Sequence, residues 1–199
     1  MNDTDLLTYN HSDSYPEWLG EKVCKFVSDM SDEELKKLLS MLKPVNDEKT
    51  AAKEDIRLCE ELDISDFSVS SGKRTDYYCL LRHTQGNFWF FENLVKNTPA
   101  CMEGKKLPFI EYNSFIKNSL FCEYAYIINL DDKCLEFWKG FQNEPDETNR
   151  YGTDADDGYY PCHMLTSYRF DEIRNSDIKN IVSDMISKKS DDDEKGICW

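Results

Sequence analysis

Apolar residues recur at helical spacing through the first half of the chain. Over residues 16–28 they form one apolar face, with Pro16 at the first helical position. Ser31 and Glu34 form a capping box that predicts the start of a second helix. Further helices are expected over 50–61 and after the capping residues Thr75 and Asp76. Residues 16–95 are therefore expected to be largely helical.

The pattern changes to alternation after residue 120. Two aromatic and β-branched runs, 122–130 and 133–139, predict a β-hairpin, and 163–168 predicts a third strand. A last helix is expected from Ser176 to about residue 187, and a short strand near 6–9. The fold class is therefore expected to be α+β, with an antiparallel sheet mainly in the C-terminal half packed with helices that lie mainly in the N-terminal half.

The length of 199 residues suits one α+β domain over 1–187. Within it, 16–95 forms the largely helical part, and 120–187 forms the sheet and the final helix. Residues 188–199 are expected to be a disordered tail because of their polar, charged composition.

The charge balance limits the partners. The chain has 39 acidic and 24 basic residues, a net charge of −15, and no basic stripe that could follow a phosphate backbone. We therefore expect no direct binding to nucleic acid. An acidic surface instead suits a protein partner with a basic surface or a nucleic-acid-binding groove, although the charge could also serve solubility alone.

Eight cysteines are spread through the predicted helices and strands, without a C-x-x-C pair or a leader sequence. This distribution favours reduced thiols in a cytoplasm over a disulfide scaffold. No apolar run is long enough to span a membrane, so no membrane partner is expected. No metal site and no cofactor are expected either.

The stretch "TYNHSDSYPEWLG" is the first candidate site. The imidazole of His11 could act as a general acid or base, with Asp13 orienting it and Tyr9 and Tyr15 donating hydrogen bonds. Together with Asn10 these residues form a hypothetical ligand-binding or catalytic set.

A structural interpretation of the same stretch stays open. Asn10, Ser12, Asp13 and Ser14 are typical of a local turn and helix cap, with the aromatic residues filling the turn. No nucleophile lies nearby, so no catalytic residue is assigned here.

The segment "NEPDETNRYGTDADDGYYP" is the second candidate site, because it joins six acidic residues to three aromatics in one long loop. Aromatic anchors within a charged rim suit a protein interface. The expected partner-binding residues are Asp146, Glu147, Tyr151, Asp154, Asp156, Asp157, Tyr159 and Tyr160. A calcium loop is excluded, because placing Gly158 at its sixth position puts Ala155 and Met164 where oxygen ligands are needed.

Four segments carry a resemblance: "YNHSDSYPEWLG", "CEYAYIINLDDKCLEFWKG", "NRYG" and "YYP". In these the chain resembles a family of uncharacterised small proteins from bacteria and their phages. The resemblance implies a related fold and a bacterial or phage setting, and it carries no mechanism. The glycine-threonine-arginine segment that often precedes the Tyr-Asn-His-x-Asp motif in that family is absent here.

Three functions follow as hypotheses. The first is an acidic interaction protein, encoded by a phage, that binds and inhibits a host defence protein. The second is a small hydrolase-like or ligand-binding domain centred on Asn10, His11, Asp13 and Tyr15. The third is a sponge for a signalling nucleotide, for which Arg74, Arg82 and Arg150 are the candidate phosphate ligands.

Overall fold

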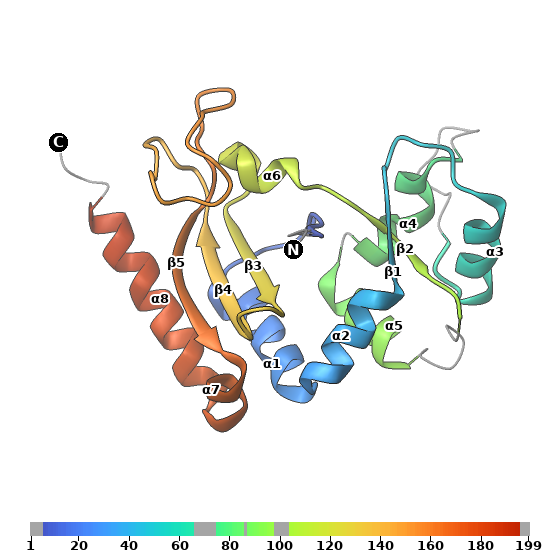
Figure 1. Ribbon diagram of the computed structural model, residues 1–199, viewed down its shortest axis with the longest axis horizontal. Coiled ribbons are helices and arrows are strands. Elements are labelled where there is room, and N and C mark those ends of the chain that lie inside the picture. Colours follow the sequence, from blue (N-terminus) through green and yellow to red (C-terminus); the bar gives the residue numbers. More distant parts are fainter. Residues whose placement is uncertain (1–5, 66–74, 86, 98–103, 196–199) are drawn as a thin grey trace. The chain divides into compact units, whose positions relative to one another are not determined.

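The computed structural model describes residues 6–65, 75–85, 87–97 and 104–195. In these residues the protein has an α+β fold, with helices over most of the N-terminal half and a three-stranded antiparallel sheet in the C-terminal half (Figure 1). The expected fold class is confirmed. A small parallel pair of strands, which we did not predict, accompanies the helices.

By its internal contacts the chain divides into two compact units, and the single domain over 1–187 stays a prediction. The helical unit comprises residues 1–12 and 36–113, and the sheet unit comprises residues 13–35 and 114–199. The boundary after Leu35 falls inside helix α2 (Asp32–Met41). The sheet unit is therefore built from two separate stretches of sequence.

Besides the second half of α2, the described residues of the helical unit form the parallel pair and further helices: β1 (Leu42–Val45), β2 (Leu107–Ile110), α3 (Lys53–Glu61), α4 (Tyr77–Gln85) and α5 (Phe88–Asn97). As predicted, Asp76 caps α4 by accepting a hydrogen bond from the Cys79 amide at 2.9 Å. The strand predicted near 6–9 is not formed. Instead, the Leu7 carbonyl accepts one backbone hydrogen bond from Tyr112, just after β2.

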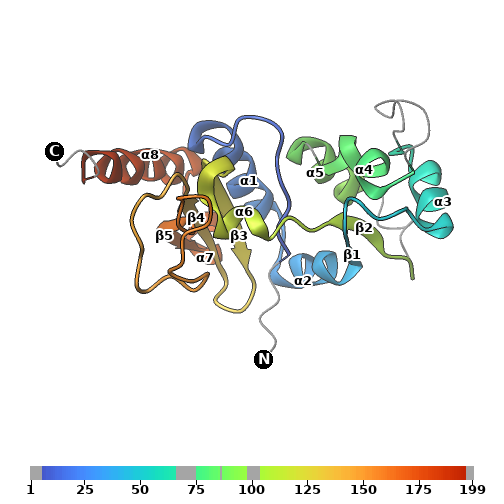
Figure 2. The same ribbon diagram turned by 90° about the horizontal axis from the view of Figure 1, so that it is seen from above.

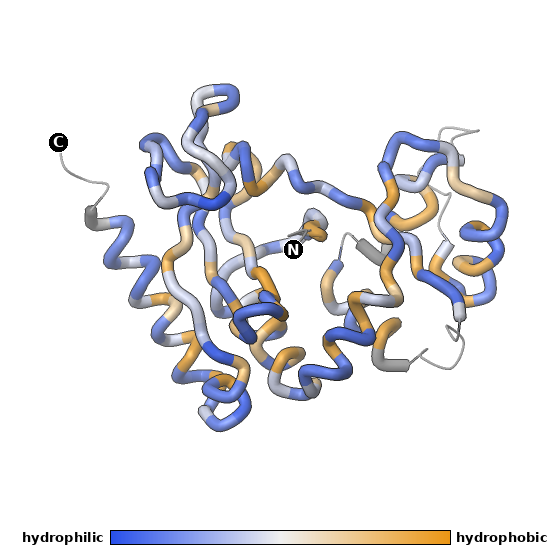
Figure 3. The backbone as a smooth tube through the Cα atoms, in the orientation of Figure 1, coloured by the Kyte–Doolittle hydropathy of each residue, from blue (hydrophilic) through white to orange (hydrophobic). Residues whose placement is uncertain are grey.

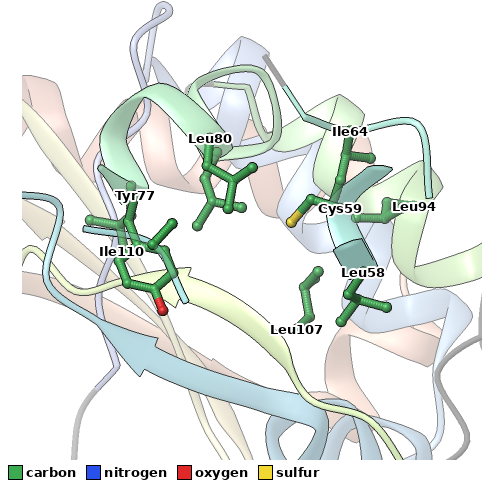
Figure 4. Packing of buried hydrophobic residues seen from close by; sticks show 10 residues of the cluster. Leu58, Cys59, Ile64, Tyr77, Leu80, Leu94, Leu107 and Ile110 are labelled. Carbon is green, nitrogen blue, oxygen red and sulfur yellow. The ribbon is translucent and has the colours of Figure 1, made fainter. Parts of the chain in front are cut away.

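Among the described residues of the helical unit, the core is apolar apart from two buried carboxylates, those of Asp55 and the capping residue Asp76. Figure 4 shows the packed side chains of Leu58, Cys59, Ile64, Tyr77, Leu80, Leu94, Leu107 and Ile110. The carboxylate of Asp55 accepts hydrogen bonds from Lys43 at 2.8 Å and from the Tyr77 hydroxyl at 2.5 Å. These partners offset the cost of burying its charge.

The sheet unit contains the strands β3 (Tyr124–Asn129), β4 (Cys134–Lys139) and β5 (His163–Arg169), in that order. The predicted hairpin is confirmed, with Tyr126 opposite Phe137 and Ile128 opposite Leu135. Its turn places Lys133 at a φ of 53°. The register between β4 and β5 shifts after Phe137, which marks a β-bulge.

The remaining elements of the sheet unit are helical: a π-helical turn (Pro16–Gly20), α1 (Glu21–Asp29), α6 (Ser114–Lys117), a 3₁₀ turn (Ser119–Phe121), α7 (Phe170–Asn175) and α8 (Ile178–Lys195). The predicted capping box is confirmed. The Ser31 amide donates to the Glu34 carboxylate at 2.8 Å, and the Glu34 amide donates to the Ser31 hydroxyl at 3.3 Å.

One face of the sheet packs against α1 and α8. The rings of Tyr126 and Phe137 stack 5.4 Å apart on this face, and Tyr126 also lies against Gly20. The Tyr168 hydroxyl donates to Asp184 of α8 at 2.8 Å. Figure 2 shows α8 along one side of the sheet and the segment after β4 extending from the other. The opposite face is therefore the one that this segment can cover.

Helix α8 continues to Lys195, so residues 188–195 are helical where we expected a disordered tail. Lys139 of β4 explains this difference, because its ammonium contacts Asp192 at 2.8 Å and Asp193 at 2.6 Å. The pairing offsets the unfavourable placement of carboxylates at the C-terminal end of a helix. Asp177, one residue after the predicted Ser176, accepts the capping hydrogen bond from Lys179. Residues 196–199 lie outside the described part of the chain.

Candidate functional site

The acidic loop (residues 144–160) is closed at its base. The Tyr160 amide donates to the Gln142 carbonyl at 2.9 Å, and the Asn149 side chain donates to the Cys162 carbonyl at 2.7 Å. Most of the loop has hydrophilic or intermediate colours in Figure 3. Its ends are thus held together next to β4 and β5.

A tight turn forms the end of the acidic loop. Asp156 and Tyr159 exchange two backbone hydrogen bonds of 2.9 and 3.0 Å. Between them Asp157 and Gly158 have φ values of 51° and 83°, the left-handed conformations that an Asp-Gly pair adopts in a hairpin turn. The local sequence therefore fixes the direction of this turn.

An ion pair between a buried glutamate and a partly exposed arginine fastens the acidic loop to the sheet. Glu136 of β4 is 3% exposed, and its two carboxylate oxygens accept from the Arg150 guanidinium at 2.7 and 2.8 Å. Asn129 and the indole of Trp138 also donate to this carboxylate, at 2.8 and 2.9 Å. The ring of Tyr151 meets the Trp138 ring edge-on, with centroids 5.2 Å apart. The bidentate geometry fixes the middle of the loop in one orientation.

These contacts keep Glu136 ionised. Burial alone would raise the pKa of its carboxyl, but the hydrogen bonds from Arg150, Asn129 and Trp138 outweigh that effect and hold the pKa below its ordinary value. Arg150 is thereby committed to an internal partner. This occupation removes support for Arg150 as a phosphate ligand in the sponge hypothesis. Arg74, another of its candidates, lies outside the described residues.

A side-chain contact joins the start of the acidic loop to β5. The Asp146 carboxylate contacts Nδ1 of His163 at 2.9 Å, with both side chains half-buried. Hydrogen bonds from the hydroxyl and amide of Thr148, and then from His163, hold the pKa of Asp146 below its ordinary value. The two residues are 17 positions apart, so no local motif indicates this contact.

The eight predicted partner-binding residues fall into two groups. Four carboxylates are exposed: Glu147, Asp154, Asp156 and Asp157. Four are half-buried: Asp146, Tyr151, Tyr159 and Tyr160. Asp146 and Tyr151 contact the protein itself, so the exposed surface of the loop is predominantly anionic.

The negative charge is concentrated in the sheet unit. Its residues include 25 acidic and 12 basic side chains, a net charge of −13, against 14 acidic and 12 basic side chains, a net charge of −2, in the helical unit. The acidic loop belongs to the more strongly charged unit. Its field adds to that of the surrounding carboxylates.

The predicted N-terminal set is divided between the units. Tyr9, Asn10 and His11 belong to the helical unit, whereas Asp13 and Tyr15 belong to the sheet unit. The Asn10 side chain donates to the Ser12 carbonyl at 2.9 Å, and its oxygen accepts from the Phe88 amide at 3.3 Å, at the start of α5. This local turn and cap favour the structural interpretation of Asn10.

Within the helical unit, the ring of His11 packs edge-on against Tyr9, with centroids 4.8 Å apart. Desolvation of the ring and the nearby charge of Arg82 lower the pKa of His11 from its ordinary value of 6.5. In the sheet unit, Tyr15 lies 5.8 Å from Tyr124, with Lys189 over its ring. Catalysis or ligand binding at this set stays a prediction.

Neither a metal cluster nor a membrane-spanning helix is present among the residues that the structure describes. No group of three or more His, Cys, Asp or Glu side chains there could hold a metal ion. No described helix is both long and apolar enough to cross a membrane.

Glu136 and Arg150 organise the site, and sequence reasoning gave Glu136 no role. The available signal was a glutamate inside the apolar run "CLEFW", because a charged residue in a buried strand needs a partner. Arg150, the one basic residue among the loop's carboxylates, was the matching half of that signal.

The fold and this site define an α+β protein with an anchored acidic loop. No protein-family model matches the chain, and no curated protein or solved structure shows significant similarity to it. The resemblance to small bacterial and phage proteins therefore stays a prediction.

Acid should weaken the attachment of the acidic loop. A carboxyl whose pKa is lower in the folded than in the unfolded chain stabilises the fold above its unfolded pKa, and this contribution is lost as pH falls through the folded pKa. For Glu136 that pKa lies below 4.5. We expect wild type to be more stable than Glu136→Gln near neutral pH, with the difference shrinking below about pH 4.5. Urea unfolding at a series of pH values measures it, and a difference that grows in acid would contradict the assignment.

Proposed function

We propose that the protein is an acidic binding module that recognises a basic surface on another protein through its acidic loop. Glu147, Asp154, Asp156 and Asp157 supply the exposed carboxylates. One observation carries the proposal: the loop that bears these carboxylates is anchored to the sheet by the ion pair between Arg150 and the buried Glu136.

Anchoring matters because a loop that is already ordered loses less conformational entropy when it binds. The tight turn at Asp157 and Gly158 and the hydrogen bond between Asp146 and His163 restrict the loop further. Carboxylates held in fixed positions can match a fixed set of lysine and arginine side chains. The concentration of negative charge in the sheet unit also steers a basic partner toward it.

The partner class follows from this charge. Grooves that bind nucleic acid are lined by lysine and arginine, and a protein that presents anchored carboxylates can occupy such a groove. Occupation would block the nucleic acid, so the activity we propose is inhibition. A defence protein of a bacterial host is the target suggested by the resemblance to bacterial and phage proteins.

A pulldown with matched charge variants tests this function. The loop variant combines Glu147→Gln, Asp154→Asn, Asp156→Asn and Asp157→Asn; asparagine tolerates the positive φ at position 157. The immobilised protein is incubated with bacterial lysate at low and at moderate salt, and captured proteins are quantified by mass spectrometry. We expect the loop variant to capture its main partner at least about tenfold less than wild type does.

The control removes the same charge from exposed positions on helices and turns of the sheet unit: Glu17→Gln, Glu21→Gln, Glu33→Gln and Glu172→Gln. It should capture the partner nearly as well as wild type. If both variants capture equally little of the partner, binding depends on the total charge of the protein and not on the acidic loop. If wild type captures no basic protein at either salt concentration, the proposal fails.

A further inference from the structure

Two phenylalanines of the sheet unit face solvent on neighbouring segments. Phe121 ends the 3₁₀ turn and is 68% exposed, and Phe141 follows β4 by two residues and is 47% exposed. Their burial on folding is incomplete, so hydrophobic stabilisation of the fold explains only part of their presence. Exposed aromatic side chains close together mark interaction sites more often than single ones do.

The backbones beneath these two rings are held tightly together. The Gly140 amide donates to the Glu123 carbonyl at 2.9 Å, and the Phe141 amide donates to the Ser119 carbonyl at 3.1 Å. The Gln142 amide donates to the hydroxyl of the fully buried Ser119 at 3.0 Å. This contact between residues 119–123 and 140–142, the crossing, therefore holds both phenylalanines on one rigid base.

Phe141 also adopts an unfavourable backbone conformation. Its φ of 54° lies in the left-handed region, where an aromatic residue is strained and glycine or asparagine is favoured. The surrounding hydrogen bonds impose this conformation, and half of the side chain gains no burial in return. Strained residues of this kind are concentrated at functional sites.

We infer that Phe121 and Phe141 are the apolar anchors of the interface, inserting into an apolar pocket of a protein partner that is bordered by lysine and arginine. This inference rests on the proposed function and adds a second recognition element to it. Gln142 directly follows Phe141 and pairs with Tyr160 at the base of the acidic loop. The exposed Glu144 lies three residues after Phe141. The two aromatic anchors are thus joined directly to the acidic loop, which forms the anionic rim of the interface.

The charge of the sheet unit determines which molecule can bind over the two phenylalanines. A second copy of this chain would bring two sheet units together, each with 25 acidic and 12 basic residues, and their repulsion opposes that pairing. A basic partner gains attraction at the rim and burial at the two rings. The anchors would then supply most of the binding energy, as central aromatic residues do in other interfaces.

The test combines a double variant, Phe121→Ser with Phe141→Gly, and two peptide probes of equal length and charge. One peptide alternates lysine with leucine, and the other alternates lysine with serine. We expect the native protein to bind the leucine peptide at least about tenfold more tightly than the serine peptide, and the double variant to lose this preference. Binding is measured by fluorescence anisotropy of labelled peptides.

Stability and a matched variant separate anchoring from folding. Because glycine relieves the strain at position 141 while the packed part of the ring is lost, the thermal midpoint should stay within about 2 °C of wild type. The control variant, Met164→Ser with Ile186→Ser, removes two other exposed apolar side chains of the sheet unit and should keep the preference.

Each other outcome has a defined meaning. If the double variant binds both peptides as the native protein does while the loop variant loses both, the proposed function stands and the anchors are refuted. If the native protein binds neither peptide, both the function and the anchors fail. A dimer of the native chain that dissociates in the double variant, measured by sedimentation, would assign the two rings to a second copy and overturn the inference.

Discussion

Replacing Arg150 with alanine is expected to lower the free energy of unfolding by about 3 kcal/mol, because it leaves the buried Glu136 carboxylate without its cationic partner. Asn129 and Trp138 still donate to that carboxylate, which keeps the expected loss at the lower end of the range for broken buried ion pairs. The same change releases the middle of the acidic loop, so binding to a basic partner should weaken together with stability.

The pH dependence of the free energy of unfolding shows whether the unpaired Glu136 carboxylate causes the loss of stability in the Arg150→Ala variant. Without Arg150, only Asn129 and Trp138 oppose the effect of burial, so the pKa of Glu136 rises relative to wild type. The loss of stability relative to wild type should therefore shrink as the pH falls into the acid range, measured by urea unfolding followed by circular dichroism.

Two further variants complete this comparison. Adding Glu136→Gln to Arg150→Ala should restore part of the stability, because the unpaired charge is removed. Arg169→Ala breaks an exposed pair with Asp171 and should change the free energy of unfolding by less than about 1 kcal/mol. An Arg150→Ala protein as stable as wild type would show that the ion pair does not hold the loop.

Replacing Gly140 with alanine is expected to cost about 3 kcal/mol or more. A Cβ at this position would lie 1.4 Å from the carbonyl oxygen of Cys122 and 3.1 Å from that of Ser119, and both are backbone atoms that cannot rotate away. The two segments must separate, which weakens the hydrogen bonds from Gly140 and Phe141 across the crossing. We expect the thermal midpoint to fall by about 6–12 °C.

Gly104→Ala provides the control for this variant. Gly104 has a φ of 72° with no atom within 4 Å of an added Cβ, so alanine there meets backbone strain without a clash. Its expected cost is about 1 kcal/mol. A Gly140→Ala protein that loses no more than the Gly104 variant does would mean that the crossing is not tightly packed.

Local signals in the sequence predicted much of the fold. The capping box at Ser31 and Glu34 and the alternation of Tyr126, Ile128, Leu135 and Phe137 each depend on residues close together in the chain. The parallel pair of β1 and β2 joins residues more than sixty positions apart, and a four-residue strand gives too short a pattern to detect. The division into two units also depends on long-range packing.

The candidate site shows the same limit. Composition pointed to residues 144–160 as a binding loop, a function that stays a prediction. It did not separate the carboxylates that face solvent from Asp146, whose partner His163 lies 17 residues away. Glu136 and Arg150 are 14 residues apart, and their pairing follows from the return of the loop over the sheet. Hydrophobic periodicity contains no information on such a contact.

The arrangement of the two units along the chain determines the order in which they can fold during synthesis. The helical unit ends at residue 113, so all of its residues are synthesised before any strand of the larger sheet. Helix α1, although made early, has its packing partners in α7 and α8, beyond residue 169. Its apolar residues Val23, Phe26 and Val27 therefore lack these partners until residues 170–195 have been synthesised, and they are exposed to chaperones and to aggregation during that interval.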